Sequence, residues 1–244
     1  MTSFKNQIAV ITGASTGIGK SIALGLAAKG AKLCLLGRKL EALEAVAKIA
    51  RKTAPRVQCY PVDLTVDQDI KKVADDLRLD FGQVDILVHS AGVFAMGRIE
   101  NAPVVDFDRQ YQTNVRAPYA LTQALLPMLR SCRGQIVFIN SSAGLNAGAN
   151  VTQYAATKHA LKAIADGFRQ ELNAEGLRVL SVYPGRTATP MQAAIFKMEG
   201  REYHPELLMQ PEDVAATVIN ALILPRSAEV TDIIIRPLTK PNEI

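Results

Sequence analysis

Residues 7–30, QIAVITGASTGIGKSIALGLAAKG, join a short apolar run to a glycine-rich turn and then to an amphipathic segment. This pattern predicts a β-strand that leads through a tight turn into a helix. The turn holds Gly13, Gly17 and Gly19, and glycine lets the backbone bend sharply and approach a pyrophosphate facing the helix N-terminus. The spacing is GxxxGxG and matches the common GxGxxG fingerprint only loosely, so its place after the first strand carries the prediction of a dinucleotide site. The predicted cofactor-binding residues of this turn are Gly13, Ser15, Thr16, Gly17, Ile18 and Gly19.

The same alternation of strand and helix continues along the chain. Further apolar runs rich in β-branched residues occupy 32–37, 56–63, 85–90, 134–140, 177–184 and 230–235. Amphipathic segments lie between them, for example at 19–30, 39–53 and 67–82. Strands that are apolar on both faces and joined by helices predict an α/β fold, a Rossmann-like, doubly wound parallel sheet of about seven strands. Without a linker or repeat, residues 1–244 are expected to form a single domain.

Composition excludes several classes of protein. The 244 residues are 48% hydrophobic and 21% charged, as in a globular chain, and the net charge is +5. The basic residues are scattered, and the densest basic run, 48–56, has no aromatic residue for base stacking, so no nucleic-acid partner is expected. No run of about eighteen apolar residues predicts a membrane span. Cys34 and Cys59 lie in apolar runs and are expected in the core, which fits a reducing, cytoplasmic location.

The three histidines and the end of the second strand bear on what the protein binds. His89, His159 and His204 have no metal-ligand spacing, so no metal is expected. The second strand ends without the carboxylate that grips the ribose in NAD-binding folds, and Arg38 follows Gly37 instead. An arginine there can pair with a 2′-phosphate, which favours NADP(H), although it can also be a solvated residue that begins a helix.

Asp63 and Leu64 follow the third strand. A carboxylate at that place can accept a hydrogen bond from an adenine amino group, or it can cap the next helix.

Seven short motifs occur in a fixed order. They are TGASTGIG after the first strand, DL after the third, SAG after the fourth, NV, NSSAG after the fifth, YAATK, and PGRTATPM after the sixth. Together they resemble the short-chain dehydrogenase/reductase family over nearly the whole chain. The resemblance implies a nicotinamide-dependent oxidoreductase in which Tyr154 and Lys158, one helical turn apart, are the YxxxK catalytic pair.

The chemistry fits these residue types. A tyrosine can donate a proton to the oxygen of a reduced carbonyl, but an ordinary phenol titrates near pH 10. A lysine ammonium one turn away, together with the positively charged oxidised nicotinamide, is expected to lower that pKa, and Lys158 would also hold the nicotinamide ribose. The resemblance gives Asn114 the role of supporting Lys158 and a water relay, whereas the residue alone favours a helix cap.

Two serines compete for the role of hydrogen-bond donor to the substrate oxygen. The family's usual second hydroxyl after the strand is Ser142, whereas the family's usual separation from the tyrosine fits Ser141. Neighbouring residues of a strand face opposite ways, so a loop shorter by one residue explains the difference more simply than an exchange of serines. We expect Ser142 to be the catalytic serine.

The chain departs from the family pattern at two places. HSAG stands where NNAG is usual, so His89 and Ser90 replace asparagines, while Ala91 and Gly92 still let the backbone approach the cofactor. The last residues lack the glycine-rich finish of many tetrameric relatives, which argues against a tetramer. The long helices after Asn114 and from Thr152 resemble the pair through which members of the family form dimers, so a homodimer or a homotetramer is expected. The loop after the sixth strand keeps the family's shape, and its predicted cofactor-binding residues are Pro184, Gly185, Thr187 and Thr189.

Residues 190–210 are expected to form a substrate lid. Its apolar side chains either line the substrate site or pack within the lid; they are Met191, Ile195, Phe196, Met198 and Tyr203. Arg186 either meets an anionic substrate or the cofactor pyrophosphate. The sequence predicts an NADP(H)-dependent oxidoreductase of a small carbonyl or secondary alcohol. The alternatives are a 3-oxoacyl-thioester reductase and an NADP(H)-binding redox sensor without turnover. Pro118 and Pro127 are expected to kink or interrupt the helix after Asn114.

Overall fold

The protein is built on a seven-stranded parallel sheet with strand order β3-β2-β1-β4-β5-β6-β7, in a computed structural model that describes residues 4–238. The strands are β1 (Ile8–Thr12), β2 (Lys32–Gly37), β3 (Val57–Pro61), β4 (Ile86–His89), β5 (Gln135–Ile139), β6 (Arg178–Pro184) and β7 (Asp232–Ile235). Every pair of neighbours is parallel. The predicted doubly wound sheet is therefore confirmed, and each strand ends within one residue of its expected bounds except the outer strands β3 and β7, which differ by two residues at one end. Residues 1–3 and 239–244 lie outside the described part. The prediction of a single domain over 1–244 and the observation on the last residues of the chain both extend into these segments.

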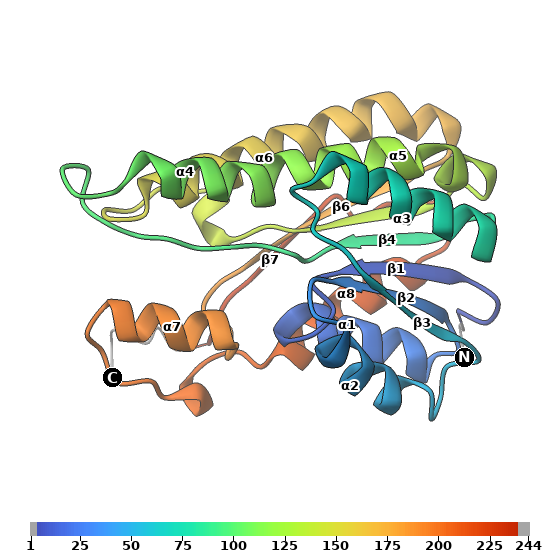
Figure 1. Cartoon of the computed structure of the whole chain (residues 1–244), viewed down its shortest axis with the longest axis horizontal. Helices are drawn as coiled ribbons and strands as arrows, with labels where there is room; N and C mark the ends of the chain where they lie inside the picture. The colour runs from blue at the N-terminus through green and yellow to red at the C-terminus, as the bar shows by residue number, and fades with distance from the viewer. Residues whose placement is uncertain (1–3, 239–244) are drawn as a thin grey trace.

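Helices cover both faces of this sheet. They are α1 (Gly17–Ala28), α2 (Leu40–Ala50), α3 (Asp67–Asp80), α4 (Val104–Tyr111), α5 (Ala117–Ser131), α6 (Thr152–Leu172), α7 (Pro190–Met198) and α8 (Pro211–Ile223). Figure 1 shows α3, α4, α5 and α6 on one side of the strands and α1, α2 and α8 on the other. This arrangement is what right-handed crossovers between parallel strands produce.

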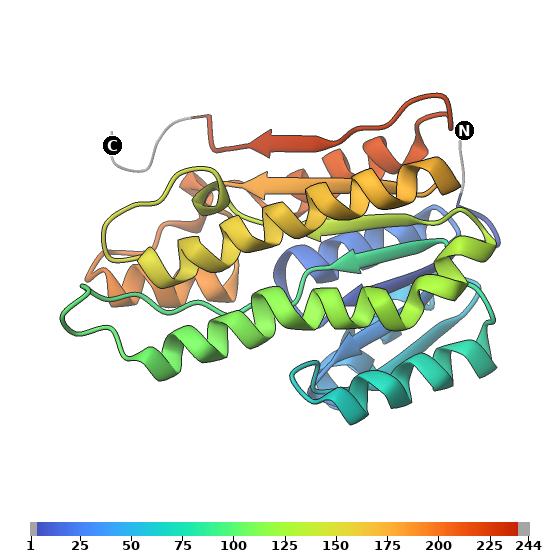
Figure 2. The same cartoon turned by 90° about the horizontal axis from the view of Figure 1, so that it is seen from above.

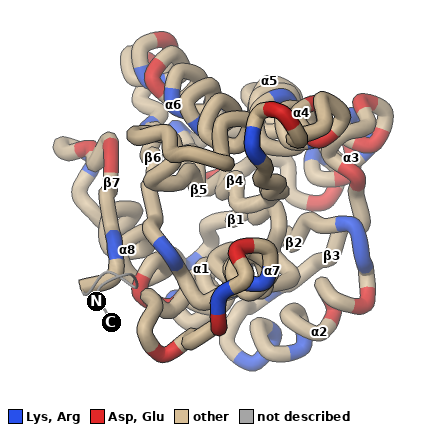
Figure 3. Tube along the Cα trace, turned by 90° about the vertical axis from the view of Figure 1, so that its left-hand side faces the viewer, with Lys and Arg blue, Asp and Glu red and all other residues tan. Residues whose placement is uncertain are grey.

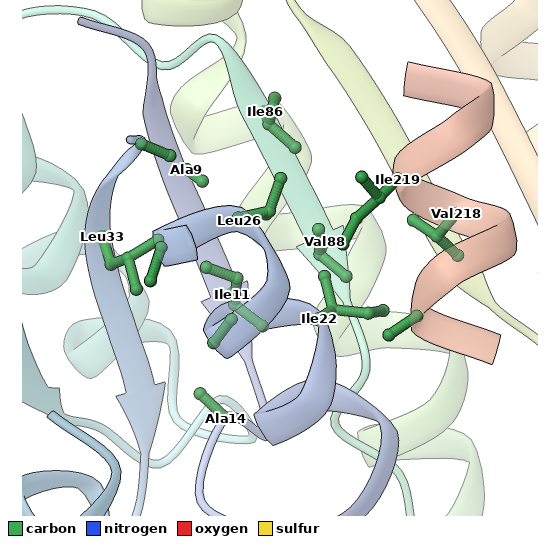
Figure 4. Packing of buried hydrophobic residues seen from close by; sticks show 14 of the residues in the cluster. Ala9, Ile11, Ala14, Ile22, Leu26, Leu33, Ile86, Val88, Val218 and Ile219 are labelled. Atoms are coloured by element: carbon green, nitrogen blue, oxygen red, sulfur yellow. The ribbon is translucent and has the colours of Figure 1, made fainter. Parts of the chain in front are cut away.

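Alternation along each strand divides the core into two layers. In β1, Ile8 and Val10 pack with α3, α5 and α6, whereas Ala9 and Ile11 pack with α1, α2 and α8. Figure 4 shows the second layer, where Ile22 of α1 lies close to Val88 of β4 and the α8 helix. Complete burial of such a side chain stabilises the fold by about 1.5–3 kcal/mol, so neither face can be exposed without a large loss.

The edge strand β3 explains why the two cysteines expected in the core are buried to different degrees, although Cys59 packs against the core as well. Cys34 on β2 is fully buried, as predicted, but Cys59 on β3 is only partly buried, because β3 has a neighbour on one side only. Within residues 4–238 the cysteines are free thiols. No helix in that part of the chain is both long enough and apolar enough to cross a bilayer. Lys and Arg segments are spread over several elements (Figure 3).

The helix near Asn114 differs from the expectation. Asn114 does not open it; α4 runs into a π-helical turn (Gln112–Arg116), which continues directly into α5. Pro118 lies directly after the π turn, at the start of α5, and Pro127 lies inside α5. The predicted interruption is thus a π turn, a feature that often marks functional sites. In Figure 2 the α4–α5 stretch and α6 run side by side across the sheet.

Candidate active site

A cleft of about 770 Å³ lies at the carboxyl ends of the strands. The chain order reverses between β1 and β4, and open parallel sheets bind ligands at such a point. Nearly all residues predicted to bind a cofactor or to act in catalysis line this cleft; only Gly19 and Asn114 do not. The lining members of the predicted set are Gly13, Ser15, Thr16, Gly17, Ile18, Arg38, Asp63, Leu64, Ser90, Ala91, Gly92, Ser142, Tyr154, Lys158, Pro184, Gly185, Thr187 and Thr189.

The three glycines of the first turn have different reasons to be glycine. Gly13 has φ of +63°, and a Cβ there would lie 2.8 Å from the backbone of Ala91. Gly17 has φ of +53° and faces Thr189, whose Cγ2 would lie 3.0 Å from a Cβ. A Cβ on Gly19 would lie 2.5 Å from the carbonyl oxygen of Gly13. Gly19 therefore lets the helix pack closely against the turn, which is the role of the last glycine in such a motif, and it does not line the cleft.

The N-terminus of α1 is open for an anion. Thr16 is the N-cap residue, but its side chain makes no capping hydrogen bond, and no acidic residue stands in the first turn. The N–H groups of the first helical turn therefore retain unsatisfied hydrogen-bonding capacity, at the positive end of the helix dipole. These donors, together with glycines that leave no Cβ in the way, fit the pyrophosphate of a dinucleotide.

Thr12 is a residue of this site that the sequence analysis missed. Its buried Oγ1 donates to the carbonyl of Val88 at 3.3 Å and accepts from the N–H groups of Ser90 and Ala91 at 3.0 and 3.1 Å. It thereby fixes the turn after β4 against the glycine turn after β1. A threonine at the end of a strand is common, so the sequence offered only its place in TGAS as a signal.

Asn114 fixes the loop that follows Gly92. Its Oδ1 accepts from the N–H of Val93 at 2.9 Å, and its Nδ2 donates to the carbonyl of Val93 at 3.0 Å and to Oγ1 of Thr157 at 3.2 Å. It is 1% exposed. Asn114 is thus neither a helix cap nor a direct partner of Lys158; it joins the loop after β4 to α6, the helix that carries Tyr154 and Lys158.

Tyr154 and Lys158 stand together on α6. The Lys158 Nζ lies 5.7 Å from the centre of the Tyr154 ring and donates to the carbonyl of Ile139 at 3.1 Å. Burial lowers the pKa of Lys158 to about 8, and burial raises the pKa of Tyr154 to about 12 although a hydrogen bond with Ser141 opposes that rise. Burial therefore dominates the pKa of Tyr154 in the protein alone, and its lowering by Lys158 together with the oxidised nicotinamide stays a prediction for the cofactor complex.

The two serines after β5 have different surroundings. Ser141 continues the extended backbone, is partly buried, and shares a hydrogen bond with the Tyr154 side chain. Its Oγ also accepts from the N–H of Ala143 at 3.2 Å, so its hydroxyl proton is left for a further acceptor. Ser142 begins a short 3-10 turn (Ser142–Gly144) and is exposed. The structure brings Ser141, and not the expected Ser142, against Tyr154.

Arg38 and Asp63 form the other end of the cleft. Arg38 is exposed just beyond the end of β2, and no hydrogen bond or ion pair involves it within residues 4–238. Hydrogen bonds from the side chain and the N–H of Thr65, together with the charge of Arg38, lower the pKa of Asp63. Asp63 thus forms a turn with Thr65 and does not cap α3, whose N-cap residue is Val66.

The segment after β6 holds α7 over the cleft. Thr189 caps α7 by accepting from the N–H of Gln192 at 3.2 Å. Arg186 pairs with Glu199 at 2.7 Å, and its guanidinium lies 4.8 Å from the centre of the Phe196 ring. The apolar side chains of the predicted lid do not all have the same role: some line the cleft and others pack within the lid. Met191 and Ile195 line the cleft, Phe196 packs edge-on against Tyr203, and Met198 is half exposed.

His89 is a structural residue in this arrangement. It is buried at the end of β4, stacks on Phe138 at 5.0 Å, and lies 2.7 Å from the hydroxyl of Thr122. Burial lowers the pKa of His89 to about 3, so the ring is neutral. It fills the place of the family's asparagine by joining β4 to α5 and the neighbouring strand β5.

The sequence matches the family described as short chain dehydrogenase over residues 7–200. The chain belongs to the short-chain dehydrogenase family. A curated relative, an uncharacterized oxidoreductase of Staphylococcus aureus strain USA300, is 32% identical over 239 residues, which are 98% of this chain and 100% of the relative.

Solved short-chain dehydrogenases have the same architecture. An alcohol dehydrogenase from the archaeon Thermococcus sibiricus, complexed with 5-hydroxy-NADP, is 25% identical with a TM-score of 0.88 and covers 97% of this chain and 99% of its own. A 7α-hydroxysteroid dehydrogenase complexed with NADH and 7-oxo glycochenodeoxycholic acid is 26% identical with a TM-score of 0.87 and covers 96% and 94%. The chain is thus a short-chain oxidoreductase whose similar structures hold NADP- or NAD-type cofactors.

Proposed function

We propose that this short-chain dehydrogenase is an NADP(H)-dependent oxidoreductase that transfers a hydride between the nicotinamide and a small carbonyl or secondary alcohol. One observation carries the proposal. A single cleft joins Arg38 at one end, the open N-terminus of α1 in the middle, and Tyr154 with Lys158 and Ser141 at the other. This order matches the three parts of the cofactor, its 2′-phosphate, its pyrophosphate and its nicotinamide.

The cofactor supplies the hydride when it is bound, and the chain supplies everything else. Tyr154, with its phenol protonated at neutral pH, donates a proton to the substrate oxygen. Ser141 donates a hydrogen bond to the same oxygen while charge develops there. Lys158, on the next turn of α6, supports the tyrosine and holds the ribose. Asn114 holds α6 and the loop after Gly92 in register.

Arg38 supports the choice of NADP(H). The end of β2 offers no carboxylate that would repel a 2′-phosphate, and the guanidinium of Arg38 has no ion-pair partner in the described part of the chain. Hydrogen bonds between charged groups contribute about 1.5–3 kcal/mol, which corresponds to about a 10- to 100-fold preference. The solved relatives contain both cofactor types, so the choice of NADP(H) rests on Arg38 and not on membership of the family.

Calorimetric titration with NADPH and NADH tests the cofactor. The native protein should bind NADPH about 10- to 100-fold more tightly, and Arg38→Ala should remove that preference while leaving NADH binding unchanged. Lys39→Ala is the matched control, because Lys39 is exposed beside Arg38 but does not line the cleft. Equal binding of both cofactors by the native protein would refute the NADP(H) assignment.

Turnover of NADPH with a panel of aldehydes and ketones tests the reaction. Tyr154→Phe should abolish hydride transfer while NADPH binding persists, and Tyr111→Phe, on the exposed face of α4, should be as active as the native protein. A Tyr154→Phe protein that retained every measurable property of the native one would favour the redox-sensing alternative. Preferential reduction of a 3-oxoacyl thioester would identify the thioester reductase.

We also propose that copies of the chain associate through α4, α5 and α6. Val104 and Val105 on α4 are 71% and 70% exposed, and Tyr119 on α5 is 46% exposed. These exposed apolar side chains lie along the continuous α4–α5 stretch, and apolar surface exposed to solvent marks protein interfaces where it forms a patch. Sedimentation equilibrium should give a dimer or tetramer, and Val104→Glu should shift it toward the monomer; a native monomer at micromolar concentration would contradict the proposal.

A further inference from the structure

Phe94 stands beside the catalytic tyrosine without a role in the chemistry described above. It lies in the loop after Gly92 and lines the cleft. Its ring centre is 4.8 Å from that of Tyr154, and the two rings meet edge to face at 64°. A carbonyl that accepts a proton from Tyr154 must lie within hydrogen-bonding distance of the phenol. The groups attached to that carbonyl therefore come close to the Phe94 ring.

The backbone on both sides of Phe94 is fixed by buried amides. Asn114 holds the N–H and the carbonyl of Val93, as described above. Gln110, which is fully buried, accepts from the N–H of Ala95 at 3.0 Å. The Gln110 amide also lies 3.4 Å from that of Gln153 on α6. Phe94 therefore sits on a loop segment clamped to the helices on either side of it, and a fixed aromatic ring selects ligands by shape.

The other side chains of this end of the cleft favour an uncharged ligand. Val151, Met191 and Ile195 add apolar surface. Arg38 lines the opposite end of the cleft, and the other two arginines that line it are each paired with a carboxylate. Arg109 contacts Asp106 at 3.0 Å, and Arg186 contacts Glu199 at 2.7 Å.

We propose that Phe94 is a specificity-determining residue and that the substrate is an uncharged carbonyl compound with an aromatic or bulky apolar group next to the carbonyl. The proposal rests on the proposed function for the position of the reacting carbonyl. Phe94 packs against that group, and Gln110 is the positioning residue that keeps the Phe94 ring in place.

Binding of unreactive amides tests the ligand class without turnover. Benzamide and acetamide each carry an uncharged carbonyl, and their dissociation constants from the protein with NADPH present are measured by ligand-observed NMR. The native protein should prefer benzamide by tenfold or more. Phe94→Ala should lower this preference about tenfold, since contact with an aromatic ring is worth about one factor of ten, and leave acetamide unchanged. Phe81→Ala is the matched control, because Phe81 packs on Arg56 and does not line the cleft.

Gln110→Leu tests whether the preference depends on a fixed position of the Phe94 ring as well as on the presence of that ring. The variant keeps Phe94 but leaves the N–H of Ala95 without its acceptor, so the loop gains freedom. The benzamide preference should fall about threefold, less than in Phe94→Ala, while urea unfolding shows that the protein remains folded. An undiminished preference in both Phe94→Ala and Gln110→Leu would overturn the proposal.

Turnover distinguishes a failure of this proposal from a failure of the proposed function. Reduction of benzaldehyde and acetaldehyde by NADPH is compared in the native protein and Phe94→Ala. Turnover with an unchanged ratio of kcat/KM values in the variant overturns the role of Phe94 and leaves the oxidoreductase intact. Absence of turnover together with a lost benzamide preference in the variant removes the proposed reaction and supports the ligand class.

Discussion

Lys158→Met is expected to make the protein more stable at neutral pH while it abolishes activity. Lys158 is 4% exposed, and its ammonium has one hydrogen bond, to the carbonyl of Ile139. Methionine has nearly the same length and flexibility but carries no charge, so it can occupy the same space. The substitution removes the cost of burying an ammonium group and leaves one carbonyl without its donor.

The magnitude follows from the pKa. Burial lowers the pKa of Lys158 from 10.5 to about 8, and at 1.36 kcal/mol for each pKa unit the charged form costs about 3 kcal/mol in the folded protein. Loss of the hydrogen bond to Ile139 lowers the free energy of unfolding by about 1 kcal/mol. The net gain at pH 7 is therefore about 2 kcal/mol, which corresponds to a rise in Tm of about 4–8 °C for a chain of this size.

The sign of the effect reverses with pH. Below pH 8 the lysine is protonated in both the folded and the unfolded chain, so the whole cost of the buried charge is present. Between pH 8 and 10.5 the unfolded chain holds more protons than the folded one, and the stability of the native protein rises. Above that range the lysine is neutral in both states, the cost is gone, and Lys158→Met should be less stable than the native protein by about 1 kcal/mol. Tyr154 is common to both proteins, so its own titration between pH 10 and about 12, which lowers stability, cancels in the difference.

Urea unfolding at pH 7, 9 and 10.5 checks this expectation. Lys162→Met is the matched control on the same helix: Lys162 is 39% exposed, pairs with Asp166 at 2.6 Å, and should cost at most about 0.5 kcal/mol without a reversal. A Lys158→Met protein that is less stable than the native one at pH 7, by an amount that does not change up to pH 10.5, would refute the reasoning. It would mean that the ammonium is well solvated in the cleft.

Three further predictions follow from contacts in the cleft. Ser141→Ala should lower kcat about 10²- to 10³-fold through loss of a donor to the developing oxyanion, whereas Ser142→Ala should stay within about threefold; steady-state kinetics with the reverse order would restore Ser142. Gly19→Ala should weaken NADPH binding at least about tenfold in calorimetry, because its Cβ would lie 2.5 Å from a carbonyl oxygen of the glycine turn. A double-mutant cycle of Arg186→Ala and Glu199→Ala should give a coupling energy of about 0.5–1 kcal/mol in urea unfolding. The coupling is modest because the two side chains are 29% and 20% exposed. A coupling of zero would show that the pair does not hold α7 in place.

The sheet could be predicted from the sequence because each inner strand packs against helices on both of its faces and is therefore apolar on both. β1 sends Ile8 and Val10 into one layer of the core and Ala9 and Ile11 into the other, so the run has to be apolar throughout. β3 shows the limit of that reasoning. It has the same kind of sequence as an inner strand, and only the pairing of strands reveals it as the edge strand that leaves Cys59 partly exposed.

The site was predictable where a single residue carries the chemistry and was not where the fold brings two segments together. A glycine such as Gly13 indicates from the sequence alone that the backbone turns sharply there. Thr12 gives no such signal, because its role depends on the turn after β4 that lies against it. Asn114 by itself favours a helix cap, because asparagine often caps helices, and the sequence does not reveal that Val93, 21 residues away in the chain, is its partner.

The two serines show how small a structural difference decides the chemistry. Ser141 and Ser142 are identical side chains on adjacent residues, and the backbone changes between them from extended to a 3-10 turn. Because successive side chains of an extended chain turn to opposite sides, the two serines cannot both face Tyr154, and Ser141 is the one that shares a hydrogen bond with it. Where β5 ends decides which serine can act, and the end of a strand is set by its hydrogen bonds to β6 and not by the residues that follow it.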